Sequence, residues 1–301
     1  MRIGINGSSS MSSLDDIVNG VRAAADDGFA TYWLAQIFAA DALTALAVAG
    51  REVPGIELGT AVVPVQPRHP QALAGQALTT QAATGGRLVL GIGLSHQPVV
   101  EGMWGISFDK PVAYFREYLD ALLPMLRGEH VSVHGERVTA VGSVDVRGAA
   151  APPVVVAALG PRMLELAGSV GAGTITWCTG PRTLAEHIVP SISRAAESAG
   201  QPAPRVVASL PICVTDDADG ARESIAAGLT VYGQLPSYRA MLDREGVAGP
   251  ADIAIVGSEA DVAAGLRRVA DAGVTDFGAA IMPRTGIEAE RTLAVLRDHL
   301  G

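Results

Sequence analysis

The segment RLVLGIGLSHQP, residues 87–98, joins an apolar run to a turn that contains two glycines, Gly91 and Gly93. A dinucleotide-binding fingerprint has a third glycine three positions after the second, and it follows the first strand of a βαβ unit. Here His96 takes the place of the third glycine, and at least three strand-like runs precede the segment. We therefore do not expect a dinucleotide loop, and the role of the turn depends on the pattern around it.

An apolar run followed by a helical pattern recurs along the whole chain. The first helix begins near Ser13, a capping hydroxyl, and has the early acids Asp15 and Asp16. The predicted strands are 2–7, 31–36, 56–63, 87–93, 152–159, 173–179, 205–214 and 274–283. Helical patterns follow them at 13–28, 41–52, 70–83, 112–128, 161–170 and 182–200, in a long region after 214 that includes 258–273, and at 290–301.

Strands that are continuous apolar runs between helices indicate a parallel sheet buried on both faces. The eight units are the number found in a (β/α)8 TIM barrel, whereas a doubly wound sheet usually stops at about five to seven strands. We predict an α/β protein with this barrel as a single domain over residues 1–301. Residues 129–146 alternate in polarity and contain Gly135, which predicts a hairpin-like insertion between βα units 4 and 5.

Composition limits the compartment and the partners. The chain has 301 residues, a 49% hydrophobic content and a formal net charge of −9. Its acids are scattered, which argues against nucleic acid or an anionic membrane as a partner. No membrane span or secretory signal is visible in the sequence, so we expect a cytoplasmic protein. Cys178 and Cys213 lack the spacing of a zinc site and are predicted to be reduced and partly buried.

The predicted barrel places the active site at the C-terminal ends of the strands, which are mostly apolar and amide-like in this chain. A metal-assisted enzyme needs several Asp, Glu or His ligands there, and we predict no metal site. A glycosidase needs two strand-end carboxylates, but Glu101 and Asp109 both follow one strand. A Schiff-base enzyme needs a desolvated lysine, and Lys110 stands at a helix start. We therefore expect a bound organic cofactor to supply the chemistry.

One strand-to-helix turn has the features of a phosphate site. The stretch AALGPRMLEL, residues 157–166, passes from a strand through Gly160 and Pro161 into a helix. The main-chain N–H groups of Gly160, Arg162 and Met163 would then face the strand ends, with the Arg162 side chain nearby. An apolar pocket with one such anion cradle suits a phosphorylated heteroaromatic compound. The alternative is an ordinary helix that starts with proline and carries a solvated arginine.

Four stretches of the chain resemble the luciferase-like monooxygenase superfamily, and more closely its deazaflavin (F420)-dependent oxidoreductase branch from actinobacteria. They are GTAVVPVQPRHP (59–70), RLVLGIGLSHQP (87–98), AALGP (157–161) and VGSEADVAAGLRRVADAGVTDF (256–277). The likeness runs over essentially the full chain. It implies F420 as the cofactor and a homodimer formed through the helices after strands 2 and 3.

The resemblance also assigns residues to the cofactor. It implies a non-prolyl cis peptide at Ala61–Val62 that supports the back of the isoalloxazine ring, with Leu94, Ser95 and His96 along the ring and ribityl chain. Gly160, Pro161, Arg162 and Met163 would hold the phosphate. The remaining assigned contacts come from strand ends and are Asn6, Ala158, Leu159 and Trp177. By this resemblance, the glycine turn at residues 91–96 is one wall of a cofactor site.

The implied reaction transfers a hydride between C5 of the deazaflavin and a small organic substrate. His96 is the expected proton donor or acceptor, because its unperturbed pKa of about 6.5 suits that work. Gln36 and Asn6 would orient polar substrate atoms. His69 is a rival proton carrier, although its place at a helix start also fits a cap. Relatives that oxidise sugar phosphates or alcohols carry an Asp-His or similar pair and often an acid where this chain has Gln36-Ile37 and Ser95-His96, which weakens a sugar-phosphate assignment.

Two other functions stay open at this point. One is a flavin mononucleotide (FMN) monooxygenase of the same fold, and the other is a non-catalytic flavin or deazaflavin carrier, since the strand ends hold few ionisable groups. The substrate is unidentified. Trp104, Phe108, Tyr114 and the 129–146 insertion suggest a sizeable apolar pocket, but aromatic residues at helical spacing are also common in a core.

Overall fold

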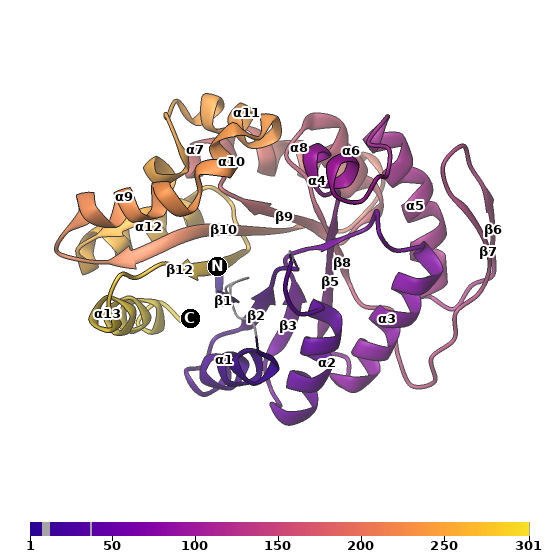
Figure 1. Ribbon diagram of the computed structural model, residues 1–301, viewed down its shortest axis with the longest axis horizontal. Helices are drawn as coiled ribbons and strands as arrows, with labels where there is room; N and C mark the ends of the chain where they lie inside the picture. The colour runs from indigo at the N-terminus through magenta and orange to yellow at the C-terminus, as the bar shows by residue number, and fades with distance from the viewer. Residues whose placement is uncertain (8–12, 37, 301) are drawn as a thin grey trace. The chain divides into compact units, whose positions relative to one another are not determined.

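The computed structural model describes residues 1–7, 13–36 and 38–300 (Figure 1). The chain divides into two compact units. Unit 1 comprises Met1–Gly7, Ala24–Trp33 and Ala158–Gly301, and unit 2 comprises Ser8–Ala23 and Leu34–Ala157. The expectation of a single domain stays a prediction.

Unit 1 is built on parallel strands. Its strands are β1 (Arg2–Gly7), most of β2 (Thr31–Leu34), β9 (Gly173–Trp177), β10 (Arg205–Val214), β11 (Ile255–Gly257) and β12 (Asp276–Ile281). Strand β12 pairs in parallel with β1 and β10, and β10 also pairs in parallel with β9 and β11. The helices are α6 (Pro161–Val170), α7 (Pro181–Thr183), η1 (Leu184–Ile188), α8 (Val189–Ser198), α9 (Ala218–Gly228), α10 (Thr230–Gln234), α11 (Pro236–Glu245), η2 (Pro250–Ile253), α12 (Glu259–Asp271) and α13 (Gly286–Arg297).

Unit 2 has a second set of parallel strands and one antiparallel hairpin. The parallel strands are β3 (Glu57–Thr60), β4 (Val63–Pro64), β5 (Leu88–Gly93) and β8 (Val154–Ala157), with β5 paired to the other three. The helices are α2 (Ala42–Glu52), α3 (Pro70–Ala83), α4 (Gln97–Gly102) and α5 (Pro111–Leu126), together with most of α1 (Leu14–Asp26). The hairpin consists of β6 (Val131–His134) and β7 (Thr139–Gly142).

In chain order, the strands β1, β2, β3 with β4, β5, β8, β9, β10 and β12 are separated by helices, as in a (β/α)8 barrel. The predicted fold class is confirmed. Two details of the sequence prediction are wrong. The third predicted strand, 56–63, is divided into β3 and β4 at the Ala61–Val62 peptide, and β11 is a short parallel strand inside a region predicted to be helical.

Helix boundaries follow from local chemistry. The Asp41 carboxylate caps α2 by accepting the main-chain N–H of Thr44 at 2.9 Å. The predicted helix over 182–200 is divided by the π-helical turn η1, which ends two residues before Pro190. Proline has no N–H to donate to the preceding turn, so the helix widens before it and continues as α8.

The two glycines of the GIG turn are explained by close packing between strands of unit 2. Gly91 N–H donates to Thr60 Oγ1 at 2.8 Å, and the same hydroxyl donates to the Gly91 carbonyl at 2.7 Å. A Cβ on Gly91 would overlap the Thr60 carbonyl oxygen, and one on Gly93 would lie 2.8 Å from the Ala157 Cβ. These glycines allow the neighbouring backbones to approach closely. This packing explains the presence of both glycines without a bound phosphate.

The hairpin β6–β7 is fixed to α5, which lies beside it in Figure 1. The Glu117 carboxylate of α5 accepts the main-chain N–H groups of residues 136–138 at 2.8–3.1 Å. These bonds, led by the one from Arg137, hold the pKa of Glu117 below its usual range. The insertion between α5 and β8 is therefore a hydrogen-bonded part of unit 2 rather than a loose excursion.

The alanine-rich faces of α2 and α3 are occupied within unit 2. Ala42, Ala45 and Ala49 of α2 and Ala74 and Ala77 of α3 are all buried, and the two helices pack on each other. Small side chains allow this close helix packing. A homodimer through these helices stays a prediction, and it would use their remaining exposed faces.

Candidate active site

The peptide bond between Ala61 and Val62 is cis, as the family resemblance implied. It lies between β3 and β4, at the C-terminal end of the third strand region, and both residues are half-buried. The Ala61 N–H donates to the Leu34 carbonyl at 2.9 Å, and the Val62 carbonyl accepts the Gln36 N–H at 3.4 Å. The bulge is thus tied by main-chain bonds to the end of the second strand region.

The residues after β5 follow the C-terminal end of the strand that pairs with β4, so they lie beside the β3–β4 region in unit 2. Leu94, Ser95 and His96 are each half-buried. Burial lowers the pKa of His96, because desolvation disfavours the imidazolium. The imidazole is therefore predominantly neutral at neutral pH. His96 precedes α4 without a side-chain capping bond to that helix.

Gln66, which was not among the predicted site residues, also lies next to Ser95. Its Oε1 accepts the Ser95 N–H at 3.2 Å, which fixes the orientation of the amide. Its Nε2 is buried and has no hydrogen-bond partner among the described residues. A buried donor without an acceptor costs about 1–3 kcal/mol, so a ligand oxygen placed there would be stabilised. The available signal was position, since Gln66 follows β4 between Pro64 and Pro67.

Gln36 is a second amide with one end already fixed. Its Oε1 accepts the Ala42 N–H at the start of α2 at 3.1 Å, which orients the amide and leaves its Nε2 able to donate to a ligand. The side chain can therefore donate to a substrate oxygen through Nε2. Ile37, named with Gln36 above, lies outside the described residues.

His69 is held in a structural position. Its Nδ1 accepts the Gln71 N–H at 3.2 Å as the cap of α3, and its Nε2 lies 2.8 Å from the Thr139 carbonyl of the hairpin. Only the tautomer with the proton on Nε2 satisfies both bonds. Both ring nitrogens are thus used to join α3 to β7, which is the capping role that the sequence allowed.

In unit 1, Asn6 is anchored at the end of β1. Its Nδ2 donates to Ser209 Oγ at 2.6 Å, and that hydroxyl donates to the Gly278 carbonyl at 2.6 Å. The bonds run through three neighbouring strands, β1, β10 and β12. With respect to the described residues, these bonds leave Oδ1 and the second N–H of Nδ2 as the groups of Asn6 that can meet a ligand.

The residues predicted to bind phosphate begin α6. Gly160, Pro161 and Arg162 are exposed, Met163 is half-buried, and Arg162 has no acidic partner in the part of the chain that the structure describes. One expectation is wrong here. The Met163 N–H donates to the Gly160 carbonyl at 3.1 Å, because the first turn is tightened by an i→i+3 bond, so it does not face a ligand. The N–H groups of Gly160 and Arg162 remain.

Two further predicted strand-end contacts, Ala158 and Leu159, differ in exposure. Ala158 is 1% exposed, whereas Leu159 is half-buried and its carbonyl lies 2.8 Å from His187 Nε2. Such a buried alanine presents almost no side-chain surface, and Leu159 presents only part of its own.

Trp177 at the end of β9 joins an aromatic cluster. It contacts Tyr232 edge to face, with 6.1 Å between ring centroids, and Tyr232 contacts Tyr238 in the same way at 5.2 Å. The next residue, Cys178, is buried and has a left-handed φ of 49°. Burial raises the pKa of its thiol well above the usual range. Cys178 and Cys213 are both free and buried.

An ion network in unit 1 uses the arginine that follows the last strand. Arg284 donates to Asp217 at 2.6 Å and to Glu288 at 2.8 Å, and the Thr215 hydroxyl also donates to Glu288 at 2.6 Å. The bond from Arg284, followed by that from Thr215, lowers the pKa of Glu288 to about 2. Arg284 is therefore engaged by acids, and Arg162 is the better cation for an anionic ligand.

Within the described ranges, no group of three or more His, Cys, Asp or Glu side chains is arranged to hold a metal ion. Over the same residues, no helix combines the length and the apolar character that crossing a membrane requires.

Residues 2–276 match the family model described as luciferase-like monooxygenase. The chain belongs to the luciferase-like monooxygenase family. A relative in this enzyme family, 5,10-methylenetetrahydromethanopterin reductase of Methanolobus tindarius, is 30% identical over 241 residues, which are 79% of this chain and 73% of the relative. The resemblance drawn from the sequence is thus confirmed.

Two solved structures show the same fold as this luciferase-like chain. One is the coenzyme F420-dependent tetrahydromethanopterin reductase from Methanopyrus kandleri, with a TM-score of 0.82 at 21% identity over 100% of both chains. The other is the oxygenating constituent of 3,6-diketocamphane monooxygenase from Pseudomonas putida in complex with FMN. It has a TM-score of 0.79 at 16% identity over 100% of this chain and 97% of that one.

Each unit by itself carries residues with the chemistry that one part of a phosphorylated flavin-like cofactor requires. In unit 2, the Nε2 of Gln66 is a donor with no partner among the residues that are described, and the pyrimidine edge of a flavin or deazaflavin carries carbonyl acceptors. The half-buried Val62 and Leu94 are apolar, as the face of a planar ring requires. The N–H groups of Gly160 and Arg162 at the start of α6 suit a phosphate.

Proposed function

We propose that this chain is an F420-dependent oxidoreductase that transfers a hydride between C5 of the deazaflavin and a small organic substrate. Membership in the luciferase-like family carries the proposal, and an F420-dependent reductase with the same fold supports the choice of cofactor. The orphaned Nε2 of Gln66 supports a ring with carbonyl acceptors. A single domain, a homodimer and a cytoplasmic location belong to the same proposal.

The cofactor-holding residues divide by unit. In unit 2 we assign the ring to Ala61, Val62, Leu94 and Ser95, and we add Gln66 as a donor to a ring carbonyl. In unit 1 we assign the phosphate to Gly160, Pro161 and Arg162, with Met163 contributing its side chain only. Asn6, Ala158, Leu159 and Trp177 stay as further proposed contacts.

When bound, the deazaflavin supplies the hydride donor or acceptor, and the chain manages one proton. His96 is the proposed carrier of that proton. Because burial lowers its pKa, the neutral ring is ready at neutral pH to accept a proton from a substrate hydroxyl while the substrate carbon is oxidised. The reverse reaction requires the imidazolium, so it should be favoured by lower pH.

Gln36 is the proposed orienting residue. Its Oε1 is occupied by the Ala42 N–H, so its Nε2 would donate to an oxygen of the substrate. An amide held in this way is already in place before the substrate binds, and little rotational freedom is lost on binding. The same argument applies to Gln66, whose partner is Ser95.

An FMN-dependent monooxygenase is the second candidate, because a monooxygenase in complex with FMN has the same fold. The assigned residues would hold the ring edge and the phosphate of FMN equally well. A non-catalytic carrier is the third.

Measuring cofactor turnover in the absence and in the presence of oxygen distinguishes the three candidate functions. Under anaerobic conditions, we expect oxidised F420 to be reduced by at least one member of a panel of alcohols, or reduced F420 to be reoxidised by an enone or imine, as followed by deazaflavin absorbance. Oxygen-dependent product formation with reduced FMN alone would instead establish the monooxygenase. Tight binding without turnover in either assay would indicate a carrier.

A further inference from the structure

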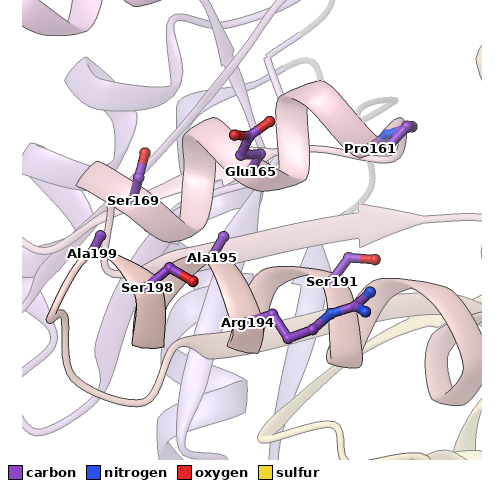
Figure 2. A pocket seen from close by; sticks show the side chains of 8 residues that line it. All are labelled: Pro161, Glu165, Ser169, Ser191, Arg194, Ala195, Ser198 and Ala199. Atoms are coloured by element: carbon purple, nitrogen blue, oxygen red, sulfur yellow. The ribbon is translucent and has the colours of Figure 1, made fainter.

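A groove between α6 and α8 begins next to the residues proposed to hold phosphate (Figure 2). Its volume is about 400 Å³. Pro161, Glu165 and Ser169 line it from α6, and Ser191, Arg194 and Ser198 line it from α8. Pro161 and Ser191 lie at one end of the groove, and Ser169 and Ser198 lie at the other (Figure 2). At about 1.5 Å per residue, the α6 wall from Pro161 to Ser169 rises roughly 12 Å.

Close packing of the two helices forms the floor of the groove. A Cβ on Gly168 would lie 2.6 Å from the Ile192 carbonyl oxygen and 2.8 Å from the Ala195 Cβ. The helices therefore approach through Gly168, and the small side chains above this contact leave open space between the exposed Glu165 and Arg194. The groove is thus fixed by two packed helices rather than by a loop.

The groove has the chemistry of a site for an extended polar chain. The Arg194 Nε donates to the Pro190 carbonyl of its own helix at 3.1 Å, and no acid pairs with Arg194 among the described residues. The walls add the hydroxyls of Ser169, Ser191 and Ser198. One unpaired cation suits a carboxylate, and hydroxyls suit amide groups because they both donate and accept.

We propose that this groove binds the γ-glutamyl tail of F420, with Arg194 pairing to a tail carboxylate and the serine hydroxyls bonding to its amides. The proposal rests on the proposed function. In F420 the tail continues from the phosphate, and Pro161 is both the first residue of α6 and one wall of the groove. FMN ends at its phosphate, so it would not reach Arg194. Binding of the tail in the groove would therefore make the affinity for F420 higher than that for FMN.

Glu165 opposes the same ligand. Its carboxylate lines the α6 wall, and no ion pair neutralises it within the described part of the chain. It would repel the carboxylates of the tail, although it can accept an amide N–H. Neutralising Glu165 and neutralising Arg194 should therefore change the affinity in opposite directions, which a general loss of structure would not do.

Fluorescence titration of the full chain tests this proposal. The ligands are F420 with several glutamates, F420 truncated at the phospholactyl group, and FMN. We expect Arg194→Gln to raise the dissociation constant of long-tailed F420 about three-fold, and Glu165→Gln to lower it about two-fold, as is typical of exposed charge pairs. Both changes should shrink at about 1 M salt. Truncated F420 and FMN should bind all variants equally.

The matched control is Arg267→Gln on α12, an exposed arginine that does not line the groove. It should leave all three affinities unchanged. Equal affinities of long-tailed F420 for the wild type, Arg194→Gln and Glu165→Gln would overturn the groove proposal and leave the proposed function standing. A wild-type chain that binds neither form of F420 would overturn both.

Discussion

The ring-binding residues proposed in unit 2 and the phosphate-binding residues proposed in unit 1 are built in opposite ways. In unit 2, the amides of Gln36 and Gln66 are each held by a main-chain N–H, and they lie half-buried beside closely packed strands. In unit 1, Gly160 and Arg162 are exposed at a helix start. If the proposed assignments are right, the first arrangement would recognise a ligand by shape and fixed donors, whereas the second would attract an anion by charge. Substitutions in unit 2 should therefore affect the stability of the fold and the rate of hydride transfer. Substitutions at the start of α6 should affect the affinity for the cofactor in a salt-dependent way.

The largest effect should come from Gly91→Ala, which disrupts the strand packing that supports the residues proposed to contact the cofactor ring. The new Cβ would overlap the Thr60 carbonyl oxygen, and the strands cannot separate without losing the Thr60–Gly91 bonds. We expect the free energy of unfolding to fall by about 3 kcal/mol in urea titrations. Gly75→Ala on α3 is the control, since nothing lies within 4 Å of its Cβ and alanine favours a helix by up to about 1 kcal/mol. Equal stability of the two variants would contradict this packing.

The second-largest effect should be a slower hydride transfer in the His96→Ala variant. If His96 carries the proton, single-turnover hydride transfer should slow about 100-fold while cofactor affinity changes less than about three-fold. Because burial lowers the pKa of His96, alcohol oxidation by the wild type should rise with pH through a midpoint below 6.5 and be level at neutral pH. An unchanged rate, or the same pH profile in the variant, would remove His96 from the mechanism.

Glu288→Gln tests why the phosphate is assigned to Arg162 and not to Arg284. Glutamine loses the charge that pairs with Arg284, and we expect a loss of about 2 kcal/mol in unfolding free energy. The Glu288 pKa is lowered from 4.5 to about 2, so its contribution is complete above about pH 4.5 and disappears as the pH falls toward 2. Wild type and variant should therefore converge in stability toward pH 2. Cofactor affinity should not change, and a large change would mean that Arg284 contacts the ligand.

The smallest effect should come from Arg162→Gln. An exposed arginine at the start of α6 should contribute about 0.2–1 kcal/mol to the binding of a phosphate, which corresponds to a weakening of at most about five-fold. The difference from the wild type should fade as salt rises. The same substitution at Arg22 of α1, which pairs with Glu52, is the control. A loss that does not depend on salt would argue against an electrostatic contact.

The fold could be read from the sequence because the βα alternation is local. The predicted helices 41–52 and 70–83 agree with α2 and α3 almost to the residue. The cis peptide at Ala61–Val62 was implied only by the family resemblance, because no periodicity distinguishes it from an ordinary strand residue. The break before Pro190 was open to prediction, since proline inside a helix pattern is a known interruption.

The site was predicted less completely, because its details depend on contacts between distant residues. Gln66 is identified by its bond to Ser95, 29 positions away, and by an Nε2 that has no partner in the ranges that the structure describes. The engagement of Arg284 by Asp217 spans 67 positions. The Met163 N–H was misjudged for a local reason, since the tight first turn of α6 depends on geometry that the residue types do not specify.

Equilibrium titration of the wild-type chain with F420 and FMN side by side, followed by the fluorescence of each cofactor, tests the central claim most directly. We predict saturable one-to-one binding of F420, with an affinity at least several-fold higher than that for FMN. Preferential binding of FMN, or no binding of either cofactor, would contradict it.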